Sequence, residues 1–251
     1  MKYTFVSQKT GFVFLTVAMF VLFTAAVYAD PPSVVEPGWE IRYSYDIGQN
    51  AYAFVPGVDI DGDGHREFVA VGRNPQQEDI FIFEATGDNS YELVWSGMRL
   101  GDAVLERGPI AVADTDNDGR MEVIVGDSGE SNDYDLVLIY EFDPTLNGGQ
   151  LGPDNPPFDP TVVLEVGFLG DGTADSRVNA VQVGDLDNDG NKEVIIGTVE
   201  ELDRSLIIYE STGDNTFAEP AMALVETGIC SLSPVADIDG DGEMEIVVFT
   251  E

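Results

Sequence analysis

A nine-residue acidic motif, D-x-D-x-D-G-x-x-E, occurs four times in this chain of 251 residues. The copies span residues 59–67, 114–122, 185–193 and 237–245. Each motif has carboxylates at positions 1, 3, 5 and 9, and its glycine at position 6 allows the sharp turn that would bring them together. Two carboxylates about 4 Å apart repel by about 4 kcal/mol at an effective dielectric constant near 20. Four of them around one centre therefore favour a bound cation.

The predicted occupant is calcium, a hard cation that takes six to eight oxygen ligands. Each site would use the four carboxylates of one motif, the backbone carbonyl at position 7, and water. The alternative is an Asp- and Gly-rich surface turn that binds no metal, and the fourfold repetition argues against it. The predicted metal residues are Asp59, Asp61, Asp63, His65, Glu67, Asp114, Asp116, Asp118, Arg120, Glu122, Asp185, Asp187, Asp189, Asn191, Glu193, Asp237, Asp239, Asp241, Glu243 and Glu245.

These motifs are not EF-hands, because an EF-hand has its bidentate Glu at position 12 of the loop. Position 12 is apolar in all four copies, and the Glu stands at position 9 instead. A short apolar, β-branched run follows each motif at once, as in Glu193-Val194-Ile195-Ile196-Gly197. Such runs after a Gly-containing turn are typical of strands. Each metal loop is therefore predicted to be the tip of a β-hairpin.

The first 29 residues are predicted to be a secretion signal. Lys2 and Lys9 supply positive charge, residues 11–27 form an apolar segment, and small residues precede Asp30, where cleavage is expected. An uncleaved anchor is the alternative. No other segment is apolar for long enough to span a bilayer. The expected location is secreted, extracellular or at the cell surface, with the periplasm as a further option, and residues 30–38 would be a linker.

The formal net charge of −36 makes nucleic acids and anionic membranes unfavourable partners. Cys230 is the sole cysteine, so no intrachain disulfide can form even in an oxidising compartment. It precedes a predicted strand and is expected to be a small buried hydrophobic residue, not a reactive thiol. Calcium would take the stapling role that disulfides have in other exported domains.

Strands are predicted on both sides of each motif, and they recur about every 50 to 70 residues. First strands are expected at 51–58, 108–113, 178–184 and 231–236, and second strands directly after each motif. Third strands are expected at 79–84, 135–140 and 205–210, and fourth strands at 91–95, 161–166 and 217–225. Residues 144–160 form a Gly-, Pro- and Asn-rich insertion. Four antiparallel strands per repeat predict an all-β fold, a β-propeller built of four-stranded blades.

The predicted ring is incomplete. Residues 39–45 fit a fourth strand that precedes the first motif, and such a strand often completes the last blade of a propeller. The chain ends after the second strand of its fourth repeat, which leaves about 3.5 blades and the closing strand. We expect a piece of a longer propeller. The alternative is an oligomer with exposed sheet edges.

Acidic hairpin tips followed by V-I-V-G and a later L-x-I-Y strand resemble the FG-GAP/VCBS repeats of integrin α-subunit propellers and many exported bacterial proteins. The resemblance covers residues 39–251. It implies the propeller fold and calcium sites at the matching loop positions. The last ligand in that family is commonly Asp, whereas it is Glu in all four copies here; Glu can also bind bidentately.

No catalytic constellation is visible, so the chain is predicted not to be an enzyme. His65 is the only histidine, which rules out His-based zinc sites, and no hydrolase or phosphate-loop motif occurs. The expected function is binding or adhesion to an extracellular protein or glycan through the face opposite the metal loops. That face would carry Arg73, Arg99, Arg107, Arg177 and Arg204, which could instead form local ion pairs. The alternatives are a structural spacer and a part of a larger polysaccharide-active enzyme.

Overall fold

The computed structural model describes residues 2–8, 13–15, 39–47, 51–72, 80–97, 109–127, 135–157, 159–166, 177–199, 205–224 and 228–250. Within these ranges the regular elements are all β-strands, and their pairings are antiparallel. No helix in the described part of the chain is long and apolar enough to cross a bilayer. The all-β prediction is confirmed.

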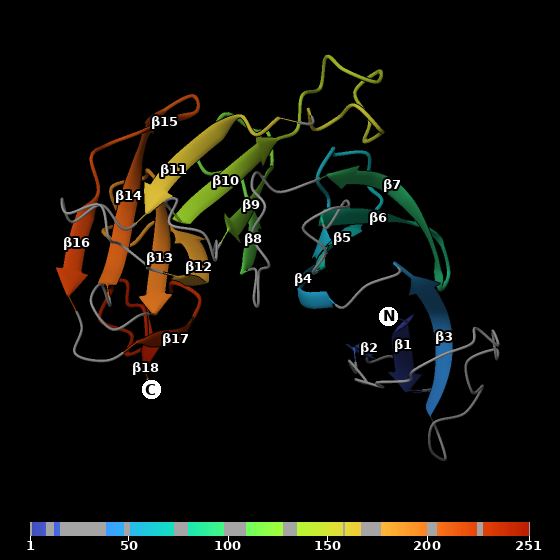
Figure 1. The fold of residues 1–251 in the computed structure, drawn as a ribbon, viewed down its shortest axis with the longest axis horizontal. Coiled ribbons are helices and arrows are strands. Elements are labelled where there is room, and N and C mark those ends of the chain that lie inside the picture. The colour runs from blue at the N-terminus through green and yellow to red at the C-terminus, as the bar shows by residue number, and fades with distance from the viewer. Residues whose placement is uncertain are drawn as a thin grey trace.

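The repeats form separate sheets in chain order (Figure 1). Repeat 1 consists of β4 (Ala51–Val58), β5 (Glu67–Gly72), β6 (Ile80–Gly87) and β7 (Ser90–Gly97). Repeat 2 consists of β8 (Ile110–Ala113), β9 (Glu122–Asp127), β10 (Asp135–Glu141) and β11 (Val162–Val166). Repeat 3 consists of β12 (Arg177–Gly184), β13 (Glu193–Val199) and β14 (Ser205–Gly213), with β15 (Thr216–Phe217) and β16 (Ala221–Leu224) both paired to β14. Repeat 4 is described as β17 (Ile229–Leu232) and β18 (Val248–Thr250).

The first strands of the four repeats face a shared hollow of about 320 Å³. Its lining includes Phe54 of β4, Ile110 of β8, Val181 of β12 and Leu232 of β17. Strands that lie far apart in sequence therefore meet around one space, with the later strands of each sheet farther out (Figure 1). This is the arrangement of blades in an incomplete propeller, as predicted.

The hydrophobic core lies between neighbouring blades. On β9, Val123 and Val125 pack in one cluster with repeat 1 residues such as Val71 and Trp95. Ile124, between them in sequence, packs in a second cluster with repeat 3 residues such as Ile196. Successive side chains of a strand point to opposite faces. In repeats 1 to 3 the continuous apolar runs after the acidic motifs are therefore explained by second strands that are buried on both faces, whereas Val247 and Phe249 in the run of repeat 4 are exposed.

Residues 39–45 form a strand as predicted, β3 (Trp39–Asp46). Its ladder runs to β1 (Lys2–Gln8), which also pairs with β2 (Val13–Leu15). In this structure β3 therefore belongs to a three-stranded sheet of the N-terminal region and is not hydrogen-bonded to β18. The secretion signal stays a prediction, and the linker at 30–38 lies outside the described residues.

The prediction that Cys230 is buried was wrong, because its side chain is exposed. The register of β17 against β18 shifts between Ile229 and Ser231, so Cys230 sits at a bulge. Ile229 and Leu232 are the buried residues of this strand. The strand also begins and ends earlier than the predicted 231–236, and beyond it Ala236 pairs with Glu245 only as an isolated bridge.

Glycines that end the apolar runs let the next blade approach closely. A Cβ at Gly197 would lie 2.5 Å from Ile229 Cγ2 of repeat 4, and one at Gly126 would lie 2.6 Å from Val178 Cγ1 of repeat 3. Real Cβ atoms do not approach carbon this closely. We expect Gly197→Ala to lower the free energy of unfolding by about 1–3 kcal/mol through overpacking, as measured by chemical denaturation. Gly87→Ala is the control, because no heavy atom lies within 4 Å of that position. Equal destabilisation by both variants would contradict this explanation.

Candidate metal centre

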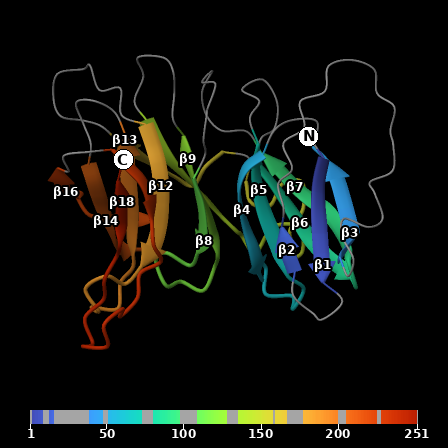
Figure 2. The same cartoon turned by 90° about the horizontal axis from the view of Figure 1, so that it is seen from below.

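Each acidic motif connects the first and second strands of its repeat. We call residues 59–67 loop 1, 114–122 loop 2, 185–193 loop 3 and 237–245 loop 4. In loops 1 to 3 the glutamate at position 9 begins the second strand, where it pairs with the end of the first strand. Figure 2 shows that the four loops project from the same end of the molecule, at the bottom of that view. The predicted hairpin tips are thus correct for loops 1 to 3, and loop 4 is closed by the Ala236–Glu245 bridge.

The four loops share one internal hydrogen-bond pattern. The position 6 amide donates to the position 1 carboxylate over 3.0–3.2 Å. The position 7 amide donates to the position 5 carboxylate over 2.7–2.9 Å. The position 5 amide donates to the position 3 carboxylate at 3.2 Å, and the position 2 amide donates to the position 9 glutamate over 2.5–2.8 Å. All four carboxylates of each motif are therefore oriented by the backbone of their own loop.

The position 6 glycines make this wrap possible. Their φ angles are 90° at Gly64, 91° at Gly119, 97° at Gly190 and 96° at Gly242, in the region that favours glycine. A Cβ at any of them would meet no heavy atom within 4 Å. The requirement for glycine is thus conformational and not a matter of space.

Several carboxylate oxygens in the loops are buried without a hydrogen-bond partner. Glu67 and Glu122 are 1% and 0% exposed; in each, Oε2 accepts the position 2 amide while Oε1 has no partner. The same holds for Glu193 Oε1, and for Oδ1 of Asp59 and Asp114 at position 1. A buried charged oxygen is costly unless it is compensated. A cation bound to these carboxylate oxygens would supply that compensation.

The same atoms gather into compact groups. In loop 2, Asp114, Asp116, Asp118 and Glu122 offer carboxylate oxygens that all lie within 4.8 Å of one another. Loops 1 and 3 bring together the predicted ligands at positions 1, 3 and 9, which are Asp59, Asp61 and Glu67, and Asp185, Asp187 and Glu193. These groups could hold a metal ion.

The other predicted ligands are placed differently. Asp63 and Asp189, at position 5, are not in those three-residue groups and face the residue at position 7. In loop 4, Asp237, Asp239 and Asp241 keep the shared hydrogen bonds but are exposed, and Glu245 is half-buried. At His65, Arg120, Asn191 and Glu243 the backbone amide donates to position 5, and the Asn191 side chain also donates to Asp189.

A second layer of acids, not predicted from the sequence, lies on the third strand. Glu84, Glu141 and Glu210 pair in register with the position 9 glutamates Glu67, Glu122 and Glu193. Like charges directly opposite across a ladder are unfavourable unless compensated. An aromatic residue precedes each of these glutamates, at Phe83, Tyr140 and Tyr209, and this recurring aromatic–Glu pair is the sequence signal that could have located them.

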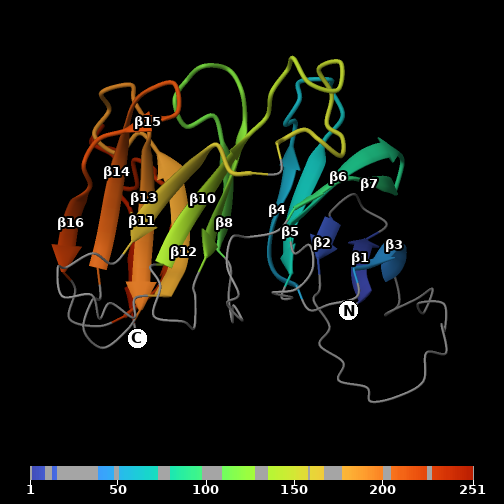
Figure 3. The same cartoon turned by 45° about the horizontal axis from the view of Figure 1, so that its top comes forward.

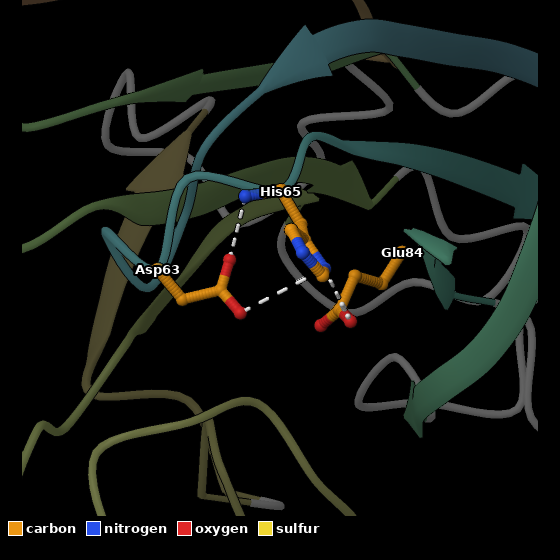
Figure 4. Close-up of side chains that lie close together, drawn as sticks. All are labelled: Asp63, His65 and Glu84. Atoms are coloured by element: carbon orange, nitrogen blue, oxygen red, sulfur yellow. Dashed lines mark hydrogen bonds and ion pairs between the residues drawn. The ribbon is translucent and has the colours of Figure 1, made fainter. Parts of the chain in front are cut away.

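In loops 1 and 2 the side chain at position 7 lies between the two layers. Figure 4 shows His65 between Asp63 and Glu84, with His65 Nδ1 3.5 Å from Glu84 Oε1 and 4.0 Å from Asp63 Oδ2. In loop 2, Arg120 forms ion pairs with Asp118, at 2.9 Å, and with Glu141. The motif predicts only a backbone role for position 7. Its side chain here also bridges the loop and the third strand.

Burial changes the acidity of the position 9 glutamates. Removal from water raises the pKa of Glu67 and of Glu122 to about 8, against an ordinary value of 4.5, and the hydrogen bond from the position 2 amide offsets part of this effect. Burial likewise raises the pKa of Glu193. Without a cation, Glu67 and Glu122 therefore stay protonated in the folded chain between about pH 4.5 and 8, where the same glutamates of the unfolded chain are ionised.

This difference predicts a pH dependence for the metal-stripped protein. Folding is favoured by proton binding to these glutamates, because their pKa is higher in the folded than in the unfolded state. This contribution to the free energy of unfolding is complete below about pH 4.5 and is lost as the pH rises toward 8. Urea unfolding of metal-stripped protein across this range should show a falling free energy of unfolding. The double variant Glu67→Gln, Glu122→Gln should flatten that slope, whereas Glu92→Gln, an exposed site, should not. An unchanged slope in the double variant would contradict the assignment.

The proposed Arg-bearing face falls largely outside the described residues. This applies to Arg73, Arg99, Arg107 and Arg204, while Arg177 begins β12. The role of these arginines stays a prediction.

Comparison with known families agrees with the geometry. The chain matches the model of the FG-GAP-like repeat over residues 59–125 and 185–248, which together make up just over half of its length. Each matched segment starts at the first aspartate of an acidic loop and extends into the second strand of the following repeat. No curated protein sequence matches the chain. With its blade-like sheets and acidic hairpin tips, this chain belongs to the FG-GAP-like repeat family.

Proposed function

We propose that this chain is an exported, calcium-binding propeller module with a non-catalytic role in binding or adhesion, in which calcium is structural. The observation that carries the calcium proposal is the set of buried, unpartnered oxygens on Glu67, Glu122 and Glu193, each grouped with aspartates of its own loop. Hydrogen bonds from the loop leave these oxygens without donors, and a cation would supply the missing charge.

Calcium suits the donor set better than other common cations. The predicted ligands of all four loops are oxygens, whereas zinc prefers nitrogen and sulfur. Magnesium requires near-ideal octahedral geometry, while calcium accepts irregular shells and bidentate carboxylates. Glu67, Glu122 and Glu193 each have one oxygen held by a backbone amide and one without a partner, and each could present both oxygens to a large ion.

The position of the loops supports a structural role for the ion. Loops 1 to 3 each join the first strand of a blade, which faces the hollow, to its second strand, which is buried between blades. Extracellular calcium modules bind with dissociation constants of about 10⁻⁴ to 10⁻³ M. A tenfold excess of free calcium over that constant contributes about 1.4 kcal/mol per site.

Calcium should therefore raise the melting temperature of the metal-stripped protein, and excess chelator should reverse the change. Glu122→Gln removes the charge of one ligand while keeping an acceptor for the Thr115 amide, so it should remove about one site's share of the gain, near 1.4 kcal/mol. Glu92→Gln, with the same change of charge at an exposed position, should keep the full gain. Scanning calorimetry with and without calcium measures both. Identical melting curves in calcium and chelator would contradict the proposal.

The binding or adhesion role is supported by membership of a family whose repeats occur in integrin α-subunits and exported proteins, and by the predicted secretion signal. The test is to probe arrays of glycans and of extracellular proteins with the calcium-loaded chain, using metal-stripped protein as the control. We expect calcium-dependent binding to a defined glycan or protein. Absence of binding would favour a structural spacer, and release of sugars from polysaccharide substrates would favour an enzyme.

A further inference from the structure

We infer that the metal loops are coupled in series, because an asparagine at position 4 of one loop holds the turn of the next loop. The inference rests on the proposed calcium function, since it concerns how one filled site affects its neighbour. It assigns Asn117 and Asn188 as positioning residues, whose side chains hydrogen-bond to the next loop.

The two contacts are equivalent. Asn117 Nδ2 in loop 2 donates to the Gly190 carbonyl of loop 3, and Asn188 Nδ2 in loop 3 donates to the Gly242 carbonyl of loop 4, both at 2.9 Å. The acceptors are the position 6 glycines, whose unusual φ shapes each turn. The next residue along the chain is position 7, whose carbonyl is a predicted ligand. Each asparagine thus fixes the backbone beside a metal site in the following repeat.

The turn itself does not require asparagine at position 4. Loops 1 and 4 have glycine there, with φ of 73° at Gly62 and 81° at Gly240, close to the 60° of Asn117 and Asn188. All four loops therefore share the backbone conformation at position 4. Loops 2 and 3 have in addition a side-chain amide there, which donates to the next loop. Glycine at position 4 in loops 1 and 4 indicates that an Asn→Gly substitution would remove the side-chain amide and keep the turn.

Other contacts strengthen the junctions that involve repeat 2. The Asn215 amide of repeat 3 donates to Asp116 Oδ2 of loop 2 at 2.7 Å, and Lys192 Nζ of loop 3 donates to the Asp114 carbonyl. Loop 1 is held by another route, in which the Leu151 amide from the 144–160 insertion donates to Asp61 Oδ2 at 2.9 Å. Figure 3 shows this insertion, in yellow, arching toward loop 1. In the described part of the chain, the Asn188 bond is the one hydrogen bond between loops 3 and 4.

A physical coupling follows from these bonds. Repulsion among its four carboxylates favours alternative conformations of a metal-free loop. An ion that orders one loop also orders the asparagine amide, or the glycine carbonyl, through which that loop is hydrogen-bonded to the neighbouring loop. The neighbouring site then needs less ordering to bind its own ion, which is positive coupling between sites. Coupling through one hydrogen bond should change the calcium midpoint of the neighbour by about threefold to tenfold.

The test reads each loop separately, by hydrogen exchange of the full chain at graded calcium concentrations. Glu245→Gln weakens loop 4 and keeps an acceptor for the Ile238 amide. We expect it to raise the calcium midpoint of loop 3 by about threefold to tenfold. In an Asn188→Gly background this shift should vanish. Asn89→Gly is the matched control, because Asn89 also has a positive φ but its side chain donates to the adjacent Asp88 and not to a metal loop, so the shift should persist.

A second junction keeps the test decisive if Asn188→Gly does not fold. Glu193→Gln should raise the midpoint of loop 2, and Asn117→Gly should reduce that shift without abolishing it, since Asn215 and Lys192 still connect the repeats. The inference would be overturned if Asn188→Gly and Asn117→Gly left the midpoint shifts of the neighbouring loops undiminished. It would also be overturned if calcium protected every loop but Glu245→Gln and Glu193→Gln, in a chain with both asparagines intact, shifted no neighbouring midpoint. If calcium protected no loop, the proposed function itself would fail, which is a distinct result.

Discussion

Repulsion among carboxylates at the hairpin tips is the constraint on which this structure depends. Every repeat passes from its first to its second strand through a loop with four acids, and in repeats 1 to 3 the second strand that follows is buried. Backbone amides and the left-handed glycine hold the acids in place, yet they leave buried oxygens on Glu67, Glu122 and Glu193 without partners. A divalent ion would resolve this conflict, whereas protonation would resolve it only in part, at one oxygen of each group.

The blades cannot be stable singly, because their cores are shared. Side chains alternate along β9 so that one set packs on repeat 1 and the other on repeat 3, as expected of repeats that bury their surfaces by stacking. Trp95 illustrates the dependence: its ring packs against Tyr140 of the next blade, and its Nε1 donates to the Pro156 carbonyl at 2.9 Å. Anything that tilts a hairpin tip also disturbs the packing between blades.

Much of this could be predicted from the sequence, because the responsible signals are local. The acidic motif, its glycine and the apolar run after it lie within about a dozen residues, so the strand–loop–strand unit was visible. The bonds from Asn117, Asn188 and Lys192 were not, since their acceptors are 54 to 78 residues away and depend on how blades stack. The exposure of Cys230 was not predictable, because it depends on the irregular pairing of β17 with β18, where the register shifts between Ile229 and Ser231. The pairing of β3 with β1 likewise depends on long-range register.

The most direct test of the central claim is to count the calcium ions bound per chain, by equilibrium dialysis at millimolar calcium followed by elemental analysis. Saturation near four ions per chain, one for each acidic loop, is the predicted result. Saturation with none, at concentrations where exported calcium modules are filled, would contradict the view that divalent ions hold these loops in shape.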